Sequence, residues 1–300
     1  MKSSRSEANA GLAGGGPYRE AIEGARDRLG RFASAVHFYP TIGSTNDAAA
    51  FLAAMRSAIG VPPATPDAAR GPTALSSDPE GIVVIAEEQT AGRGRRGHTW
   101  FSAPCSGLYV SVVLMPSRAT VDPPRAIRLL TVAAGVALSE AINVATGLNV
   151  DIKWPNDLYI GRRKLAGILA EGAISGLTVE PIVLGYGINV GRAVYPADLA
   201  DRATSLEIEL GRGVERETLF VETLASLSRR YDDLLSGRFD VILDAWRRRA
   251  PSACGTRVRW RGPDGEQSGV TSGMDDQGAL LVRLGDQTRP IVAGELQWEI

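Results

Sequence analysis

The sequence predicts an α+β fold, in which a mostly antiparallel sheet carries helices on one face and a small β-barrel follows it. Two observations lead to this fold class. Apolar strand candidates flank one long apolar helix candidate in the first 190 residues. After Pro251, apolar and polar residues alternate between Gly and Asp turns, which is typical of short strands in a barrel.

The elements are expected in chain order from turn residues and apolar runs. Residues 1 to about 16 are small and polar and predict a flexible segment, and 18–32 predict a short amphipathic helix. The turn at Gly43 and "STN" (44–46) precede an alanine-rich helix. A Pro- and Ala-rich insert at 61–81 reads as a surface loop. Strands are expected at 82–88, 108–115, 150–154, 164–174 and 181–190, a buried helix at 126–147, and amphipathic helices at 215–237 and 239–250.

Composition excludes several classes of protein. The 300 residues carry a formal net charge of −1, whereas a dedicated nucleic-acid binder usually has a basic excess. Two distant cysteines and two histidines argue against a disulfide framework and a zinc site. No apolar run approaches the roughly 20 residues that span a membrane, and the first residues lack the apolar core of a signal peptide. We therefore expect a cytoplasmic protein that binds neither nucleic acid nor a membrane.

The stretch "QTAGRGRRGHTW" (89–100) concentrates arginine and glycine after a predicted strand. Its glycines let the backbone approach a ligand, and Arg93, Arg95 and Arg96 supply planar donor groups suited to phosphate. It is neither a Walker loop nor a clean dinucleotide fingerprint. Composition alone leaves three alternatives open: a solvated turn, a phosphate-binding loop or a nucleic-acid contact.

Two further stretches carry polar groups at strand ends. In "KWPNDLYIGRRKLAGILAE" (153–171), Lys153 ends an apolar strand, where a lysine is costly to desolvate and tends to be paired or used. Asn156 and Asp157 follow in a turn and offer oxygen ligands for Mg²⁺, an amide or a ribose. In "GYGINV" (185–190), Asn189 can donate and accept hydrogen bonds, as adenine recognition requires. A surface turn and a buried strand remain the plainer interpretations of these two stretches.

No serine or cysteine is paired with a histidine for nucleophilic catalysis. Arginines, lysines, glycines and a carboxylate turn suit nucleotidyl transfer instead, because that chemistry depends on positioning and on neutralising phosphate charge.

These stretches in this order resemble the biotin–protein ligase family. The matching pieces are "STN" (44–46), "EEQTAGRGRRGHTW" (87–100), "GLYVSVVL" (107–114), "KWPNDLYIGRRKLAGILAE" (153–171), "GYGINV" (185–190) and "VAGEL" (292–296), and they extend over residues of roughly 37–300. The resemblance implies a class II synthetase-like biotin/lipoate ligase domain at 31–252, after a flexible leader and short helix at 1–30, and an SH3-like β-barrel at 253–300.

The resemblance also implies a biotin–[acetyl-CoA-carboxylase] ligase reaction with ATP and Mg²⁺. Biotin is activated to biotinyl-5′-AMP and then transferred to a lysine of a biotin carboxyl carrier protein, a subunit of acetyl-CoA carboxylase or of a related carboxylase. The expected enzyme is a monomer or homodimer. The alternative within the same fold is a lipoate- or octanoate-protein ligase.

Site residues carry over from the family motifs as expectations. The biotin-binding residues are expected to be Ser44, Thr45, Asn46, Gln89, Gly92, Arg93, Arg95, Lys153 and Gly167. The nucleotide-binding residues are expected to be Arg95, Arg96, Trp100, Asn156 and Asn189. Lys153, Arg95 and Arg93 are the expected catalytic residues, and Asp157 is the expected metal ligand.

Two features depart from the family pattern. His98 stands where the family loop often has a further arginine. The leader is too short for the helix-turn-helix domain of members that double as repressors, so the resemblance is to the monofunctional type. The resemblance assigns no role to the insert at 61–81.

Overall fold

The computed structural model describes residues 12–13, 16–59, 77–172, 181–262, 265–292, 294 and 296–299. Residues 1–11 of the leader and 61–76 of the Pro-rich insert lie outside the described residues. The chain forms two compact units, one made of Met1–Met115 with Ala170–Gly187 and the other of Pro116–Leu169 with Ile188–Ile300.

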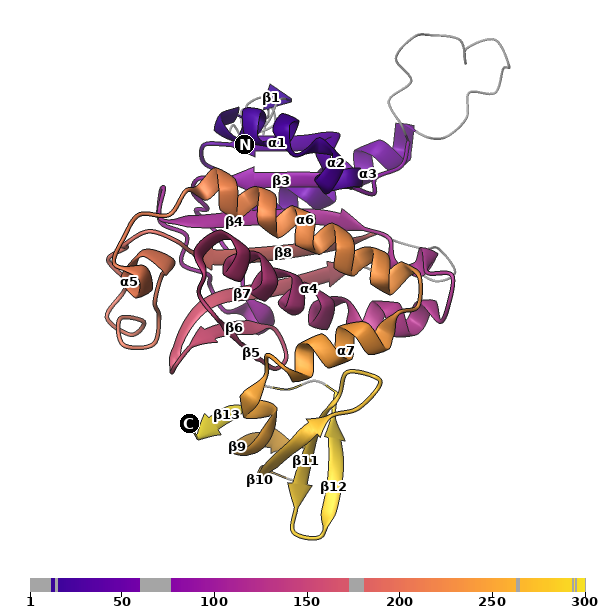
Figure 1. The fold of residues 1–300 in the computed structure, drawn as a ribbon, viewed down its shortest axis with the longest axis vertical. Helices are drawn as coiled ribbons and strands as arrows, with labels where there is room; N and C mark the ends of the chain where they lie inside the picture. The colour runs from indigo at the N-terminus through magenta and orange to yellow at the C-terminus, as the bar shows by residue number, and fades with distance from the viewer. Residues whose placement is uncertain are drawn as a thin grey trace, which may run out of the picture. The chain divides into compact units, whose positions relative to one another are not determined.

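The first unit is built on a sheet whose strands run in the order β1-β2-β3-β4-β8 (Figure 1). These strands are β1 (Leu12–Ala13), β2 (Ala35–Tyr39), β3 (Ile82–Ala86), β4 (Gly107–Leu114) and β8 (Ile182–Asn189), of which β8 enters the second unit at its last two residues. Strand β2 runs antiparallel to β1 and parallel to β3, and β3 runs antiparallel to β4. The predicted strands at 82–88, 108–115 and 181–190 are thus confirmed to within two residues at each end.

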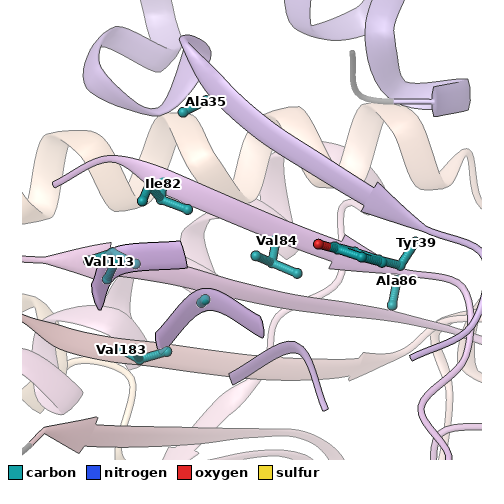
Figure 2. Close-up of a cluster of buried hydrophobic side chains, with 9 residues drawn as sticks. Ala35, Tyr39, Ile82, Val84, Ala86, Val113 and Val183 are labelled. Atoms are coloured by element: carbon teal, nitrogen blue, oxygen red, sulfur yellow. The ribbon is translucent and has the colours of Figure 1, made fainter. Parts of the chain in front are cut away.

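An apolar cluster fixes helix α3 (Thr45–Ile59) against this sheet (Figure 2). The helix contributes Ala49 and Ala53, whose short side chains are almost fully buried. The strands contribute Ala35, Tyr39, Ile82, Val84, Ala86, Val113 and Val183. Alanines on the buried face let the helix backbone approach the strands closely, and the first turn of α3, which carries "STN", is held in place by this packing.

The leader helix is shorter and more broken than the sequence predicts. Helices α1 (Arg19–Gly24) and α2 (Arg26–Leu29) are separated at Ala25, and a 3₁₀ turn follows at Gly30–Ala33. Their apolar side chains are buried, with Leu29 and Phe32 fully inaccessible to solvent. The Tyr18 hydroxyl donates to Glu87 at 3.3 Å. The segment is therefore part of the first unit's core.

The second unit contains the antiparallel strands β5 (Asp151–Lys153), β6 (Asp157–Ile160) and β7 (Arg163–Gly172), of which β7 enters the first unit at its last three residues. Helix α4 (Pro123–Thr146) lies beside α6 (Arg216–Leu235), and the shorter helices are α5 (Leu206–Leu210) and α7 (Phe239–Arg247) (Figure 1).

Helix α4 ends at the glycine that the sequence predicts, but it begins at Pro123, three residues before the predicted start at 126. The Asp122 side chain accepts a hydrogen bond from the Arg125 backbone N–H at 3.1 Å, and Pro123 occupies the first helical position. The helix ends at Gly147, whose φ of +81° favours glycine. By length and composition α4 is apolar enough to cross a membrane, contrary to our expectation for this chain, but most of its apolar stretch is buried inside the unit, as in a core helix.

A buried ion-pair network joins α4 to α6. Arg230 donates from Nε to Glu140 at 3.0 Å and from Nη1 to Asp233 at 2.9 Å, and Arg249 lies 3.3 Å from Glu140. The Glu140 side chain is only 14% exposed. Removing one partner of such a network leaves buried charge uncompensated.

We predict that Glu140→Ala lowers the free energy of unfolding by about 3 kcal/mol, because it leaves the Arg230 guanidinium without its main partner. Chemical denaturation measures this loss. The control is Glu23→Ala, which removes an exposed pair with Arg19 and is expected to cost less than about 0.5 kcal/mol. Equal losses in the two variants would contradict the structural role of Glu140.

The C-terminal strands form a five-stranded antiparallel sheet of order β12-β11-β10-β9-β13. The strands are β9 (Cys254–Gly262), β10 (Gly265–Met274), β11 (Leu280–Leu284), β12 (Gln287–Ile291) and β13 (Gln297–Glu299). The Trp154 indole donates to the Gly278 carbonyl at 3.0 Å, which ties the β10–β11 turn to the end of β5. The predicted α+β class, with a mostly antiparallel sheet and a C-terminal β-sheet domain, is confirmed.

Candidate active site

The arginine loop folds as a narrow turn after β3. The Trp100 backbone N–H donates to the Gly92 carbonyl at 2.9 Å, and the Gly94 N–H donates to the His98 carbonyl at 2.7 Å. Arg96 has a φ of +55°, so the chain reverses at this residue. A Cβ on Gly92 would lie 2.6 Å from the Trp100 carbonyl oxygen, so the loop base has no room for a side chain. The loop geometry therefore depends on backbone bonds at its base.

The basic side chains of the loop differ in exposure. Arg93 and Arg96 are exposed, Arg95 is half-buried, and His98 is exposed at the position where the family often has arginine. Arginine donors at the surface of a rigid turn can bind an anion with both nitrogens of the guanidinium fork.

The "STN" triplet lies buried at the start of α3 and contacts the same loop. The backbone N–H and the hydroxyl of Thr45 donate to the Gln89 side-chain oxygen at 2.9 and 3.0 Å. The Gln89 amide in turn donates to Ser102 at 3.0 Å. Two of the predicted biotin-binding residues, Thr45 and Gln89, thus lie in one polar network.

Ser111 extends this network from the middle of β4. Its hydroxyl lies 2.8 Å from the Thr45 hydroxyl and 2.6 Å from the Asn46 side-chain oxygen, and it is fully buried. Sequence reasoning missed Ser111. A polar residue inside the apolar run "LYVSVVLM" is the signal that could have found it, because buried polar groups need partners.

Arg93 is held by two carboxylates. Its Nη2 lies 2.8 Å from Glu171 and 2.8 Å from Asp47, and the same Glu171 oxygen accepts from the Asn46 amide at 2.7 Å. Burial alone would lower the pKa of the Arg93 guanidinium, but Glu171 and Asp47 together raise it, so Arg93 stays charged. The sequence placed Glu171 inside a motif but gave no reason to assign it a role.

The glycines of "GYGINV" make room for two of the predicted site residues. A Cβ on Gly185 would lie 2.1 Å from the Asn46 side-chain oxygen, and one on Gly187 would lie 2.4 Å from the Trp100 indole nitrogen. Strand β8 therefore forms a flat surface on which Asn46 and the Trp100 ring rest.

We predict that Gly187→Ala lowers the free energy of unfolding by about 1–3 kcal/mol, because the added methyl group overlaps the Trp100 ring. The control is Gly24→Ala in α1, where a Cβ meets no atom within 4 Å, and this change is expected to be neutral or slightly stabilising. Urea unfolding of both variants checks the prediction, and an unchanged midpoint for Gly187→Ala would count against the packing of Trp100 on β8.

In the second unit, Lys153 ends β5 between two aromatic rings. Its Nζ lies 4.4 Å from the centre of the Tyr159 ring and 5.4 Å from the centre of the Trp298 ring. Burial raises the pKa of Tyr159 to about 12, with Asp157 acting in the same direction and Arg202 against it. The Tyr159 ring therefore stays neutral, and an indole ring is always neutral, so the faces of both rings attract the ammonium group.

Three charged side chains, Asp157, Lys164 and Arg202, act on the Lys153 ammonium group. Burial lowers the pKa of Lys153 from 10.5 to about 8, Asp157 opposes this shift, and Lys164 and Arg202 add to it. Lys164 lies 2.7 Å from Asp157. The site therefore holds a lysine whose charge is easily changed, as is common at functional sites.

Asp157, the predicted metal ligand, lies among basic side chains. Its carboxylate is paired with Lys164 and lies near Lys153, so cations already compensate it. The Asn156 amide donates to the Ile168 carbonyl at 2.8 Å. Among the residues that the structure describes, no group of three or more His, Cys, Asp or Glu side chains is placed to hold a metal ion. The metal role of Asp157 therefore stays a prediction.

The remaining predicted residues are placed as follows. Asn189 is buried, and its amide donates to the Thr204 carbonyl at 2.9 Å, so its side chain is fixed in one orientation. Gly167 pairs with Asp157 across β6 and β7. Ser44 is buried at the start of α3. The predicted site residues therefore fall in both units: the loop residues and "STN" lie in the first unit, and Lys153, Asn156, Asp157, Gly167 and Asn189 lie in the second.

Comparison with known proteins identifies the family. A family model described as the biotin/lipoate A/B protein ligase family matches residues 65–189, and one described as the biotin protein ligase C-terminal domain matches residues 253–297. Among solved structures, a biotin protein ligase from Aquifex aeolicus in complex with biotin and ATP has a TM-score of 0.68 at 24% identity, covering 88% of this chain and 98% of that one. This last likeness shows the fold.

Curated relatives are similar over most of their length. The biotin–[acetyl-CoA-carboxylase] ligase of Paracoccus denitrificans is 35% identical, over 67% of this chain and 83% of its own. The protein of the same name from Mycobacterium tuberculosis is 34% identical, over 74% and 81%. The bifunctional ligase/repressor BirA of Bacillus subtilis is 34% identical, over 75% and 68%. The chain belongs to the biotin protein ligase family.

Proposed function

We propose that this chain is an ATP-dependent biotin–protein ligase. It joins the carboxylate of biotin to the α-phosphorus of ATP, releasing pyrophosphate, and then transfers the biotinyl group to a lysine amine, releasing AMP. The observation that carries the proposal is the continuous polar network that links "STN", Gln89 and the arginine loop. The names of its relatives as biotin ligases support the same reaction.

The polar side chains of "STN" and Gln89 suit the ring of biotin. The ureido ring offers two N–H donors and one carbonyl acceptor, so it needs both acceptors and donors from the protein. Thr45 and Ser44 supply hydroxyls, Asn46 and Gln89 supply amides, and Gly92 lets the loop pack closely against Gln89. The existing bonds among these side chains hold them in place before the ligand arrives.

The arginines suit the anionic end of the adenylate. Arg93 and Arg95 are assigned to the biotin carboxylate and the phosphate, and Arg96 to the phosphate, because planar guanidinium groups bind such oxygens with paired hydrogen bonds. Trp100, with its ring packed on Gly187, supplies apolar surface for the nucleotide. Asn156 and Asn189 complete the nucleotide contacts that we propose.

Lys153 neutralises negative charge on the reacting carboxyl and phosphoryl oxygens. Its position between two aromatic rings restricts the direction of its ammonium group. An ammonium group fixed in place stabilises developing charge more than one that must reorganise. Gly167, opposite Asp157 on the neighbouring strand, is the glycine of this unit that we assign to the biotin contacts.

Magnesium enters this account with ATP. Among the described residues no group of three or more His, Cys, Asp or Glu side chains is placed to hold the ion, so we assign it mainly to phosphate oxygens and water, with Asp157 as the one proposed protein ligand.

The remaining proposals concern partners and organisation. We propose that the acceptor is a biotin carboxyl carrier protein of acetyl-CoA carboxylase or of a related carboxylase. We also propose that the enzyme is a monomer or homodimer in the cytoplasm and that it binds neither nucleic acid nor a membrane. We also propose a leader at 1–30, a catalytic domain at 31–252 and an SH3-like barrel at 253–300.

Exchange of labelled pyrophosphate into ATP tests the first half-reaction. We expect exchange with biotin and background exchange with lipoate, octanoate or no acid. Exchange that requires lipoate or octanoate instead would assign the chain to the alternative ligase type. Exchange that needs no acid would overturn the proposal.

A further inference from the structure

One carboxylate oxygen of Glu171 accepts two hydrogen bonds, one from Asn46 at the start of α3 and one from Arg93 in the arginine loop. It lies 2.7 Å from the Asn46 amide nitrogen and 2.8 Å from Nη2 of Arg93. Asn46 belongs to the triplet assigned to the biotin ring, and Arg93 belongs to the loop assigned to the anionic end of the ligand. Glu171 therefore touches both.

The contacts continue from Asn46 back to the base of the loop. The Ser111 hydroxyl joins Asn46 to Thr45, and Thr45 donates to Gln89. Gln89 and Arg93 lie four positions apart in the same loop, so the hydrogen-bonded chain begins and ends on that loop. A ligand that moves one member of such a chain changes the bonds available to the others.

The carboxylates of Glu171 and Asp47 contact only one nitrogen of the Arg93 guanidinium, so its other N–H groups can bind a ligand. A guanidinium group has five N–H donors, and two of them are on Nη2. The contacts of the Arg93 side chain with Glu171 and Asp47 both use Nη2. Holding that nitrogen orients the planar group, so the N–H groups of Nε and Nη1 point in a fixed direction.

We propose that Glu171 is a positioning residue that couples the binding of biotin to the binding of ATP. This proposal rests on the proposed function. Biotin fixes Asn46, Asn46 fixes Glu171, and Glu171 fixes the Arg93 guanidinium in the direction that the nucleotide phosphate requires. By linkage, ATP bound at Arg93 strengthens biotin binding by the same factor.

Asp47 provides a matched comparison. It contacts the same nitrogen of Arg93 at the same 2.8 Å and carries the same charge, but its carboxylate is 63% exposed and it is not part of the chain of contacts from Asn46 to Arg93. Asp47→Asn therefore removes a charge from Arg93 and leaves the path through Glu171 intact. Glu171→Met removes the path, and Glu171→Gln keeps an oxygen that can still accept both bonds.

Calorimetric titration of biotin, without and with saturating α,β-methylene-ATP, measures the coupling. We expect wild-type protein to bind biotin about 10-fold more tightly in the presence of the analogue. The factor is expected to fall to near 1 in Glu171→Met, to recover in part in Glu171→Gln and to stay at its wild-type value in Asp47→Asn. A variant that fails to fold would bind biotin weakly even without the analogue. A variant that has lost only the positioning would bind biotin without the analogue, but the analogue would no longer tighten that binding.

Three outcomes would overturn the inference: a wild-type factor of 1, a wild-type factor retained in Glu171→Met, or an equal loss in Asp47→Asn and Glu171→Met. Wild-type protein that binds no biotin in either titration would overturn the proposed function itself. The failure of the coupling and the failure of the function are thus separate results.

Discussion

Replacing Lys153 with alanine is expected to slow formation of biotinyl-5′-AMP by about 10²–10³-fold, which is typical for loss of one fixed group that stabilises transition-state charge. The Lys153 Nζ lies 4.4 Å from the centre of the Tyr159 ring and 5.4 Å from that of the Trp298 ring, so the position of its charge is restricted. A single-turnover experiment with excess enzyme measures the rate of adenylate formation directly. A rate within about threefold of wild type would remove Lys153 from the mechanism.

The pH dependence of the same rate separates charge from packing. Burial lowers the pKa of Lys153 to about 8, so the free enzyme loses this charge as the pH rises through 8, well below the pH at which an ordinary lysine does. We expect kcat/KM for biotin activation in wild type to fall between about pH 7.5 and 9. Lys153→Arg keeps its charge, so its residual activity is expected to lack this fall.

Replacing Arg95 with alanine is expected to shorten the time for which the enzyme holds the adenylate by about 10- to 100-fold, because a hydrogen-bonded charge pair contributes about 1.5–3 kcal/mol. Adenylate formation depends more on Lys153 and is expected to change less. Dissociation of labelled biotinyl-5′-AMP, chased with unlabelled adenylate, gives the holding time.

Arg212→Ala is the control for the loop arginine, because Arg212 is an exposed arginine that follows α5 outside the loop. We expect it to leave the dissociation rate unchanged. If Arg95→Ala and Arg212→Ala behaved alike, the assignment of Arg95 to the phosphate would be wrong.

Local sequence signals predicted most of the fold. The glycine end of α4 is decided within a few residues and was predicted, whereas the start signal at Asp122 and Pro123 was overlooked and the helix was expected three residues too late. Strand β2 was missed because "AVHFY" is short and mixes polar with apolar residues. The leader was expected as one helix, but burial of Leu29 and Phe32 against the first unit's core determines its broken path.

The candidate site was less predictable because its decisive contacts are distant in sequence. Asn46 and Glu171 are 125 positions apart, and Arg93 and Glu171 are 78 apart, so no local pattern connects them. The motif residues were named from resemblance, whereas their bonding partners follow from the packing of β4 and β8 around α3. The metal role of Asp157 was inferred from its residue type and stays a prediction, whereas its pairing with Lys164 is a contact that no local pattern predicted.

Mass spectrometry of an acceptor protein tests the proposed ligase activity most directly. Purified chain is incubated with ATP, biotin and a biotin carboxyl carrier protein, and parallel samples contain lipoate, no nucleotide or a carrier whose acceptor lysine is replaced by arginine. We predict addition of one biotinyl group to the carrier lysine, only in the sample that contains ATP, biotin and the intact carrier. An unmodified carrier in that sample, or a carrier modified with lipoate instead, would contradict the assignment of this chain as a biotin–protein ligase.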